Sequence, residues 1–254
     1  MQDEFTERLR DLSLASRILA QHGVVDGFGH ISCRDPRAPD DHFLLSRNLA
    51  PALVVPEDIV VWRIIDAQPV NPDSPRGFLE RSIHSEIYRQ HKDVHAVVHF
   101  HSPDVIPFGV APIPFKAIFH MASFLGSSNP PIFDIAQDFG PSTDMLIRNT
   151  THGASLASLF LPPEQSQLTR PLVLMRGHGA TLTAPSLKLA VFRAIYTQTN
   201  ARILTSLSAL TGGQSNIKFL SQEECQQATE SISGQVGRAW DVWARELEDN
   251  GHSM

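Results

Sequence analysis

The sequence predicts one α/β domain that spans residues 1–254, with a central, mainly antiparallel sheet and helices on both faces. A length of 254 residues suits one large domain or two small ones, and no linker or low-complexity segment divides the chain. Hydrophobic residues make up 42% of the chain, which is ample for a sizeable core. Amphipathic helical patterns alternate with short runs of β-branched residues, and this mixture indicates the α/β class.

The N-terminal part of the chain reads as a helix followed by short strands. The helix carries leucine and isoleucine at helical spacing until Gly23 ends it in the manner of a C-cap. Turn-rich segments separate the strand-like runs. The predicted elements are a helix at residues 4–22 and strands at residues 28–33, 43–46 and 59–65.

Residues 79–90 form the next predicted helix, with Leu79, Ile83 and Ile87 on one apolar stripe. Glu80 lies in its first turn, where a carboxylate suits the helix dipole. The alternative is that Glu80 is only a surface charge.

The C-terminal half continues with helices and strands separated by proline and glycine. The longest predicted helix is Ser186 to Leu210, and we assign Gln198, Asn200 and Arg202 to its polar face. The remaining predicted elements are a helix that begins at Ser102–Pro103, a strand within 117–124, a helix at 149–160, a strand at 172–175, a capped helix from Ser221 and a final helix with Trp240 and Trp243.

Histidines recur at strand spacing within residues 94–101, which read as a buried strand. His99 and His101 are two residues apart, so both imidazoles point to the same face. Two imidazoles on an apolar strand need a partner, and a metal ion is the commonest one. The alternative is two core histidines, each hydrogen-bonded to a carbonyl. Farther along, His178 lies between two glycines, which let the backbone approach a neighbour closely.

The order of these residues resembles the class II aldolase/adducin family from about residue 8 to about residue 205. Glu80, the His99-x-His101 pair and His178 match the family's metal ligands, and residues 26–32 resemble its Gly-Asn-x-Ser segment. The resemblance implies that Glu80 and the three histidines bind one divalent metal ion, which could be zinc, manganese, cobalt or iron. It also implies a layered α/β/α fold and a homotetramer with active sites at the subunit interfaces.

A metal ion held by three neutral imidazoles and one carboxylate keeps most of its charge and remains a strong Lewis acid. Such an ion can chelate a substrate through two adjacent oxygens and stabilise an enolate. Retro-aldol cleavage, epimerisation and decarboxylation all pass through an enolate. The ligand set therefore predicts the intermediate but does not choose the reaction.

Departures from the family's sugar-phosphate pattern favour an aromatic acid as the substrate. Phe78 and Leu79 stand where the aldolases have a phosphate-binding serine pair, and His30 replaces the asparagine of the Gly-Asn-x-Ser segment. Ser46 and Arg47 lie in the segment that replaces a threonine and a glycine. One side of the former phosphate pocket becomes apolar and the other basic, which suits a flat ring that bears carboxylates.

Five short segments resemble the decarboxylases of hydroxylated aromatic dicarboxylates within this family. They are residues 29–32, 44–47, 79–81, 106–109 and 119–122. This resemblance implies a lyase that removes carbon dioxide non-oxidatively from an aromatic or heteroaromatic acid with an ortho hydroxyl group. The alternatives are a retro-aldol or dehydrating lyase on a non-phosphorylated, polyketide-like substrate, an iron oxygenase on the same fold, and a non-catalytic adducin-like assembly protein.

The predicted site residues divide into ligands, catalytic groups and substrate contacts. Glu80 is both a metal ligand and a catalytic group. His120 is the candidate general acid, and a core histidine is the alternative. Arg47 is the predicted carboxylate clamp because its planar fork suits two-point binding, although it could be a solvated charge. The other predicted substrate contacts are His30, Ser46 and Phe78.

Three further interpretations concern histidines near the ligands. His30 is either a site residue or a structural histidine in a turn. His84 lies one helical turn after Glu80 and either supports the ligands or lies on the surface. His95 is expected to face solvent at the start of its strand.

Charge and targeting signals argue against several classes of partner. The net charge is −6 and no basic run is present, so nucleic acid is not an expected partner. Residues 1–10 lack the apolar region of a signal peptide, and no apolar run is long enough to span a membrane. Cys33 and Cys225 do not suggest a disulfide framework. We therefore expect a cytoplasmic enzyme with a small-molecule substrate.

Overall fold

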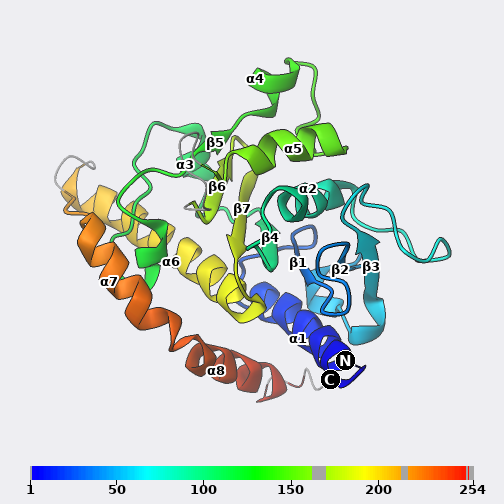
Figure 1. Cartoon of the computed structure of the whole chain (residues 1–254). Coiled ribbons are helices and arrows are strands. Elements are labelled where there is room, and N and C mark those ends of the chain that lie inside the picture. The colour runs from blue at the N-terminus through cyan, green and yellow to red at the C-terminus, as the bar shows by residue number, and fades with distance from the viewer. Residues whose placement is uncertain (1, 162–169, 213–216, 250, 252–254) are drawn as a thin grey trace.

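A central sheet organises the computed structural model, which describes residues 2–161, 170–212, 217–249 and 251 (Figure 1). Within these residues the sheet has seven strands in the order β3-β2-β1-β4-β7-β6-β5. Neighbouring strands pair antiparallel, except that β5 and β6 are parallel, so the predicted mainly antiparallel sheet is confirmed. The strands are β1 (His30–Arg34), β2 (His42–Ser46), β3 (Ile59–Arg63), β4 (Ala96–Phe100), β5 (Ile132–Phe133), β6 (Leu172–Met175) and β7 (Gly179–Ala184).

Helices cover both faces of the sheet, so the predicted α/β/α layering is also confirmed (Figure 1). Helices α2 and α5 lie over one face, and α1, α6 and α8 lie over the other. The α-helices are α1 (Gln2–Gln21), α2 (Ser82–Gln90), α3 (Ile106–Val110), α4 (Ile135–Phe139), α5 (Thr150–Ser158), α6 (Leu187–Thr211), α7 (Gln222–Ser233) and α8 (Val236–Asp249). Short 3-10 helices are η1 (Pro51–Leu53), η2 (Pro56–Asp58), η3 (Leu79–Arg81) and η4 (His120–Leu125).

Alternation along the strands divides the buried side chains into two clusters. On β4, Ala96, Val98 and Phe100 join the apolar cluster under α1 and α6. Val97 joins the cluster under α2 and α5. His99 points the same way as Val97, because residues two apart on a strand share a face. The sheet therefore presents His99 to α2.

The predicted strand within residues 117–124 is wrong. Residues His120–Leu125 form η4 instead, and the backbone of Ala117 bonds to Gly126 and Leu220 rather than to a strand. A short apolar run is compatible with either structure. Packing of η4 against α6 and α7, which the local pattern does not encode, decides in favour of the helix.

The predicted polar face of α6 is wrong for two of its residues. Gln198 and Asn200 are buried. The amide of Gln198 accepts a hydrogen bond from Ser102 Oγ (2.7 Å) and donates one to the carbonyl of His22 (3.0 Å). The amide of Asn200 likewise bonds to two backbone groups of residues 116–118. Both amides hold loops against the helix. These polar side chains therefore make buried hydrogen bonds and do not face solvent.

Several local signals are confirmed, whereas some elements escaped prediction. The Ser221 hydroxyl accepts from the backbone of Glu224, whose carboxylate accepts from the backbone of Ser221, so α7 begins with a capping box. The helix predicted from Ser102–Pro103 begins only at Ile106. The elements that the sequence did not predict are η1, β5, α4 and β7.

Two predictions about covalent and membrane features can be compared with the structure. Cys33 and Cys225 are both free, in agreement with the sequence, and both are buried. Among the described helices, none combines the length and the apolar character that a membrane crossing requires.

Candidate metal centre

Four predicted ligands converge at one end of the sheet. One nitrogen from each of His99, His101 and His178 and one oxygen of Glu80 all lie within 4.8 Å of one another. His99 is on β4, His101 follows β4, and His178 lies in the turn between β6 and β7. Because Phe100 of β4 pairs with Ala180 of β7, the sheet register brings the two histidine segments together.

Gly179 permits the close approach of these two segments. It has a φ of +155°, and a Cβ atom there would lie 2.1 Å from the carbonyl oxygen of Phe100. No larger residue fits that position without moving the backbone. The predicted role of the glycines beside His178, a close approach to a neighbouring backbone, is therefore confirmed at Gly179.

Glu80 is placed by a backbone turn and not by a helix dipole. Its φ of −90° and ψ of 17° are non-helical, and α2 begins only at Ser82. For the same reason Leu79 is 42% exposed and does not join the buried stripe of Ile83 and Ile87. The backbone N–H of Ile147 donates to Glu80 Oε1 at 2.9 Å, which leaves Oε2 directed toward the histidines.

Distances within the cluster fit a bound divalent ion. Glu80 Oε2 is 3.5 Å from both His99 Nε2 and His178 Nε2, and the Nε2 atoms of His99 and His101 are 3.0 Å apart. Bond lengths of about 2.0–2.1 Å in a tetrahedral zinc site place neighbouring ligand atoms about 3.4 Å apart. The donor set and spacing therefore fit zinc or a similar transition metal.

Hydrogen bonds on the far side of two imidazoles orient their ligand nitrogens. His99 Nδ1 lies 3.2 Å from Thr181 Oγ1, and His101 Nδ1 lies 3.4 Å from Asp26 Oδ1. A proton on Nδ1 leaves the Nε2 lone pair free to bind metal. Asp26 Oδ1 also accepts from the backbone of Phe28 and Gly29, so one carboxylate holds both the loop and a ligand.

Burial sets the protonation states of the cluster. It lowers the pKa of His101 to about 4 and also lowers the pKa of His99. Burial alone raises the pKa of Glu80, but the adjacent imidazoles of His178 and His99 outweigh it and hold that pKa below its usual value. Neutral imidazoles and an ionised carboxylate are the forms that bind a metal ion.

His30 and Phe78, both predicted substrate contacts, lie beside the cluster. The His30 ring centroid is 5.1 Å from that of His99 and 4.5 Å from that of Phe78. His84 is fully buried and bonds to His30, so the surface interpretation of His84 is wrong. His95 is exposed, as predicted.

Arg47 approaches the same region, but Ser46 does not. The backbone of Arg47 bridges to Gly77, the residue before Phe78. Arg47 Nε donates to Asp58 Oδ1 at 2.7 Å, and none of the described residues bonds to its two terminal nitrogens. Ser46 is buried and shares the strand face of Leu44, which belongs to the apolar cluster under α1.

His120, the predicted general acid, is exposed on η4. It does not belong to the four-residue cluster of its own chain.

Sequence reasoning missed four side chains that support this region. Asp26 and Thr181 contact ligand imidazoles, and Ser32 and Tyr88 continue a hydrogen-bonded chain behind His30. A signal for Tyr88 was present, because it follows His84 at a spacing of four on a helix. Its partner Ser32 is 56 residues away in sequence, and only the fold brings them together.

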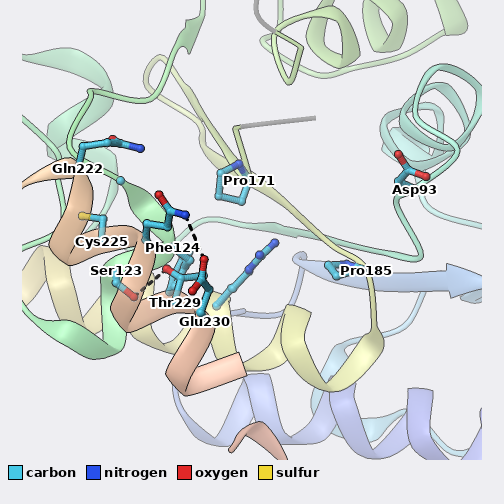
Figure 2. A pocket seen from close by; sticks show the side chains of 12 residues that line it. Asp93, Ser123, Phe124, Pro171, Pro185, Gln222, Cys225, Thr229 and Glu230 are labelled. Carbon is cyan, nitrogen blue, oxygen red and sulfur yellow. Dashed lines mark hydrogen bonds between the residues drawn. The ribbon is translucent and has the colours of Figure 1, made fainter. Parts of the chain in front are cut away.

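A large hollow in the described part of the chain lies elsewhere. Its volume is about 880 Å³, and none of the four ligands lines it. Figure 2 shows Thr229 and Glu230 on one side and Pro171 and Pro185 across from them. These prolines flank the β6–β7 hairpin at the end opposite His178. Because the hollow gathers no set of metal ligands, we assign the chemistry to the cluster.

The fold and the four-ligand centre together define the class of protein. The sequence model of the Class II Aldolase and Adducin N-terminal domain matches residues 10–205, and the chain belongs to this family. The match ends before α7 and α8, so the extent of a single domain over residues 1–254 stays a prediction.

Particular relatives narrow this class. The chain is 43% identical over 245 residues to Decarboxylase tropJ from Talaromyces stipitatus, which covers 92% of this chain and 91% of the relative. It is 29% identical over 252 residues to 3,4-dihydroxyphthalate decarboxylase from Arthrobacter keyseri, with 93% and 91% covered. An aldolase II superfamily protein from Pseudomonas syringae shares the fold, with a TM-score of 0.75 and 21% identity over 97% of this chain and 94% of that one. The chain is therefore a lyase, and its predicted resemblance to the decarboxylases of the family is confirmed.

Proposed function

We propose that the protein is a metal-dependent, non-oxidative decarboxylase of an aromatic or heteroaromatic acid with a hydroxyl group ortho to the departing carboxylate. The observation that carries the proposal is the contact of Phe78 with His30, whose ring lies beside that of the ligand His99, together with the backbone bridge from Arg47 to Gly77, the residue before Phe78. The names of two relatives support decarboxylation over the other reactions of an enolate.

Desolvation explains why an aromatic acid suits this site better than a sugar phosphate. Phe78 is buried beside His30, and Leu79 exposes apolar surface next to Glu80. A phosphate dianion against these side chains would lose hydration without gaining hydroxyl and backbone donors in return. An aromatic ring loses little by the same contact.

Arg47 would hold a second carboxylate of the substrate. Its Nε is bonded to Asp58, which fixes the plane of the guanidinium. The terminal nitrogens remain available for a charge-assisted hydrogen bond. The substrate class therefore includes di-acids, in which one carboxylate leaves and the other is retained.

The reaction requires a proton at the ring carbon that bears the departing carboxylate. A C–H bond forms at that carbon, the bond to the carboxylate breaks, and its electron pair restores the aromatic ring as carbon dioxide leaves. A divalent ion held by Glu80 and the three histidines would supply a Lewis acid for the charge that develops on the substrate oxygen. His120 is the proposed acid, acting in the site of a neighbouring subunit because it is exposed in its own.

The assembly that this mechanism needs is a homotetramer with sites at the subunit interfaces, and we propose a cytoplasmic location for it. The bound ion would be zinc, manganese, cobalt or iron, since each accepts three imidazoles and a carboxylate.

A substrate screen tests the proposal. Protein loaded with each of the four metals is incubated with hydroxylated aromatic di-acids, with and without EDTA, and the release of carbon dioxide is measured. We expect metal-dependent release from an ortho-hydroxy di-acid and no cleavage of fuculose-phosphate-like or ribulose-phosphate-like sugars. Efficient cleavage of a sugar phosphate would contradict the proposal, and products of oxygenation or dehydration would point to the alternative chemistries.

Arg47→Lys tests the clamp within the same screen. An ammonium group cannot reproduce the two-point grip of the guanidinium, so KM for the di-acid should rise roughly tenfold. Arg63→Lys is the matched control, because Arg63 also pairs with an aspartate, Asp66, but lies on the surface of β3. An unchanged KM in Arg47→Lys would remove the clamp from the proposal.

A further inference from the structure

We infer that a buried hydrogen-bond chain from Tyr88 through Ser32 and His84 fixes His30 as a hydrogen-bond donor toward the substrate. Tyr88, Ser32 and His84 are then positioning residues, and His30 recognises an acceptor oxygen of the substrate. This inference rests on the proposed function for the identity of the substrate, but the hydrogen-bond chain stands on its own geometry.

The chain consists of three short hydrogen bonds across two elements. Tyr88 Oη lies 2.8 Å from Ser32 Oγ, which lies 2.6 Å from His84 Nδ1. His84 Nε2 lies 2.7 Å from His30 Nδ1. His30 and Ser32 are two apart on β1, and His84 and Tyr88 are four apart on α2, so each element presents its pair to the other.

All four side chains are buried, and none is more than 2% exposed. Polar groups at this depth cost free energy unless they are hydrogen-bonded. Ser32 has one hydroxyl proton and a neutral imidazole has one ring proton, so the three bonds run in one direction when each of these protons is donated within the chain.

The tyrosine end determines that direction. Burial raises the pKa of Tyr88 well above its usual value, so the hydroxyl keeps its proton and must donate it. Among the described side chains, only Ser32 is in hydrogen-bonding contact with the Tyr88 hydroxyl.

The remaining bonds follow from this first one. Tyr88 donates to Ser32, Ser32 donates to His84 Nδ1, and the proton on His84 Nε2 is donated to His30 Nδ1. His30 Nδ1 is then an acceptor, and the ring proton of a neutral His30 lies on Nε2. The reverse direction would leave the tyrosine proton without an acceptor.

The free nitrogen of His30 is the one that serves the site. None of the described residues bonds to His30 Nε2. The ring itself is close to those of Phe78 and His99, at centroid distances of 4.5 Å and 5.1 Å. A substrate ring against Phe78 therefore meets a fixed N–H donor beside the metal ligands.

A donor fixed in this way selects among substrates. It stabilises a carboxylate or a carbonyl oxygen and rejects a group that can only donate.

Nitrogen-15 NMR of the zinc-loaded, full-length protein tests the direction of the hydrogen-bond chain without any substrate. The ring signals of His30 are assigned by their loss in His30→Gln. We expect a single tautomer with the proton on Nε2 in the wild type and a mixture of tautomers in Tyr88→Phe. A wild-type proton on Nδ1, or a Tyr88→Phe spectrum identical to the wild type, would overturn the inference.

Kinetics on the di-acid test the consequence. Tyr88→Phe should raise KM roughly tenfold with a smaller effect on kcat and no loss of bound zinc, because one hydrogen bond to the substrate is weakened. Tyr196→Phe is the matched control, since Tyr196 is the only other tyrosine and no described residue bonds to its hydroxyl. If the two tyrosine substitutions change KM equally, Tyr88 has no specific role in substrate binding.

Ser32→Ala provides a second break in the chain, and it serves alone if Tyr88→Phe does not fold. Because both residues act through one chain, the KM of the double variant should be close to that of either single variant. Additive effects would show two independent structural defects. A protein that shows the fixed tautomer but decarboxylates no aromatic acid would contradict the proposed function and support the hydrogen-bond chain.

Discussion

The two faces of the sheet differ in the polarity of the side chains that strands β1, β4 and β7 bury there. Toward α1 and α6, strands β1, β4 and β7 present only apolar side chains, whereas toward α2 they present polar ones. The apolar residues are Ile31, Cys33, Ala96, Val98, Phe100, Ala180, Leu182 and Ala184. The polar residues are His30, Ser32, Arg34, His99, Thr181 and Thr183, and Val97 is the apolar exception on this face.

This difference shows how a metal centre can be placed without interrupting the core. Adjacent residues of one strand belong to opposite faces, so a ligand such as His99 needs no gap in the apolar side. The apolar face supplies burial energy, roughly in proportion to its area. On the polar face, His30, Ser32 and His99 each have a side-chain hydrogen-bond partner, and these bonds make the arrangement specific.

The largest expected effect is the loss of metal and activity when a ligand of the metal centre is removed. His178→Ala removes one of four ligands, so bound metal should be lost and the rate of decarboxylation should fall by roughly a thousandfold or more. The protein should stay folded, because His178 lies in a turn and the apolar face is unchanged. Elemental analysis, a thermal melt and the carbon dioxide assay check the three parts.

His95→Ala is the control for this prediction, because His95 is exposed at the start of β4. It should keep both metal and activity. Stoichiometric metal in His178→Ala would remove that residue from the ligand set.

The opposite result is expected on the apolar face. Leu182 is fully buried on β7, and Leu182→Ala should lower the free energy of unfolding by about 2–5 kcal/mol through lost burial and a cavity. Bound metal per folded chain should not change. Urea unfolding and elemental analysis measure the two quantities.

The neighbouring residue supplies a matched comparison. Thr181→Val preserves the volume at the next position of β7 but removes the oxygen that faces His99 Nδ1. It should weaken metal binding by about tenfold, in the range seen for groups that orient ligands. If Thr181→Val and Leu182→Ala have the same profile of stability and metal affinity, the two faces are not distinct.

The sequence was sufficient for the parts of this comparison that depend on local spacing. Strand alternation at His99 and His101 and the glycines beside His178 predict the ligands, and their order resembles the family. The hairpin at residues 28–33 and 43–46 and the capping box at Ser221 were likewise visible, because each depends on neighbours in the chain.

Contacts between distant segments could not be predicted in this way. Glu80 is held by the backbone of Ile147, 67 residues later, and not by a helix turn. His101 meets Asp26 across 75 residues. The run that forms β7 alternates alanine and threonine around one leucine, and only its pairing with β4 and β6 shows that it is a central strand.

The smallest expected effect is a dependence of stability on pH, which arises on the polar face and not on the apolar face. Burial lowers the pKa of His84 to about 3, and its ordinary value is 6.5. Above pH 6.5 the residue is neutral in both the folded and the unfolded protein, so it contributes no pH dependence there. Below pH 6.5, His84 binds a proton in the unfolded chain but not in the folded chain. The free energy of unfolding therefore falls as the pH falls from about 6.5 toward 3.

The size of this pH effect follows from the difference between the folded and unfolded pKa values of His84. Between pH 7.5 and pH 5, one such histidine lowers the free energy of unfolding by about 2 kcal/mol. Urea unfolding of chelator-treated protein at several pH values measures the slope, and chelation keeps metal release out of it. His84→Gln removes the titrating group, so its slope should be shallower than that of the wild type by this amount. Leu182→Ala is the control, since a loss on the apolar face should lower stability equally at every pH. If His84→Gln keeps the wild-type slope, His84 does not titrate between the folded and unfolded states, and the polar face owes its pH dependence to other groups.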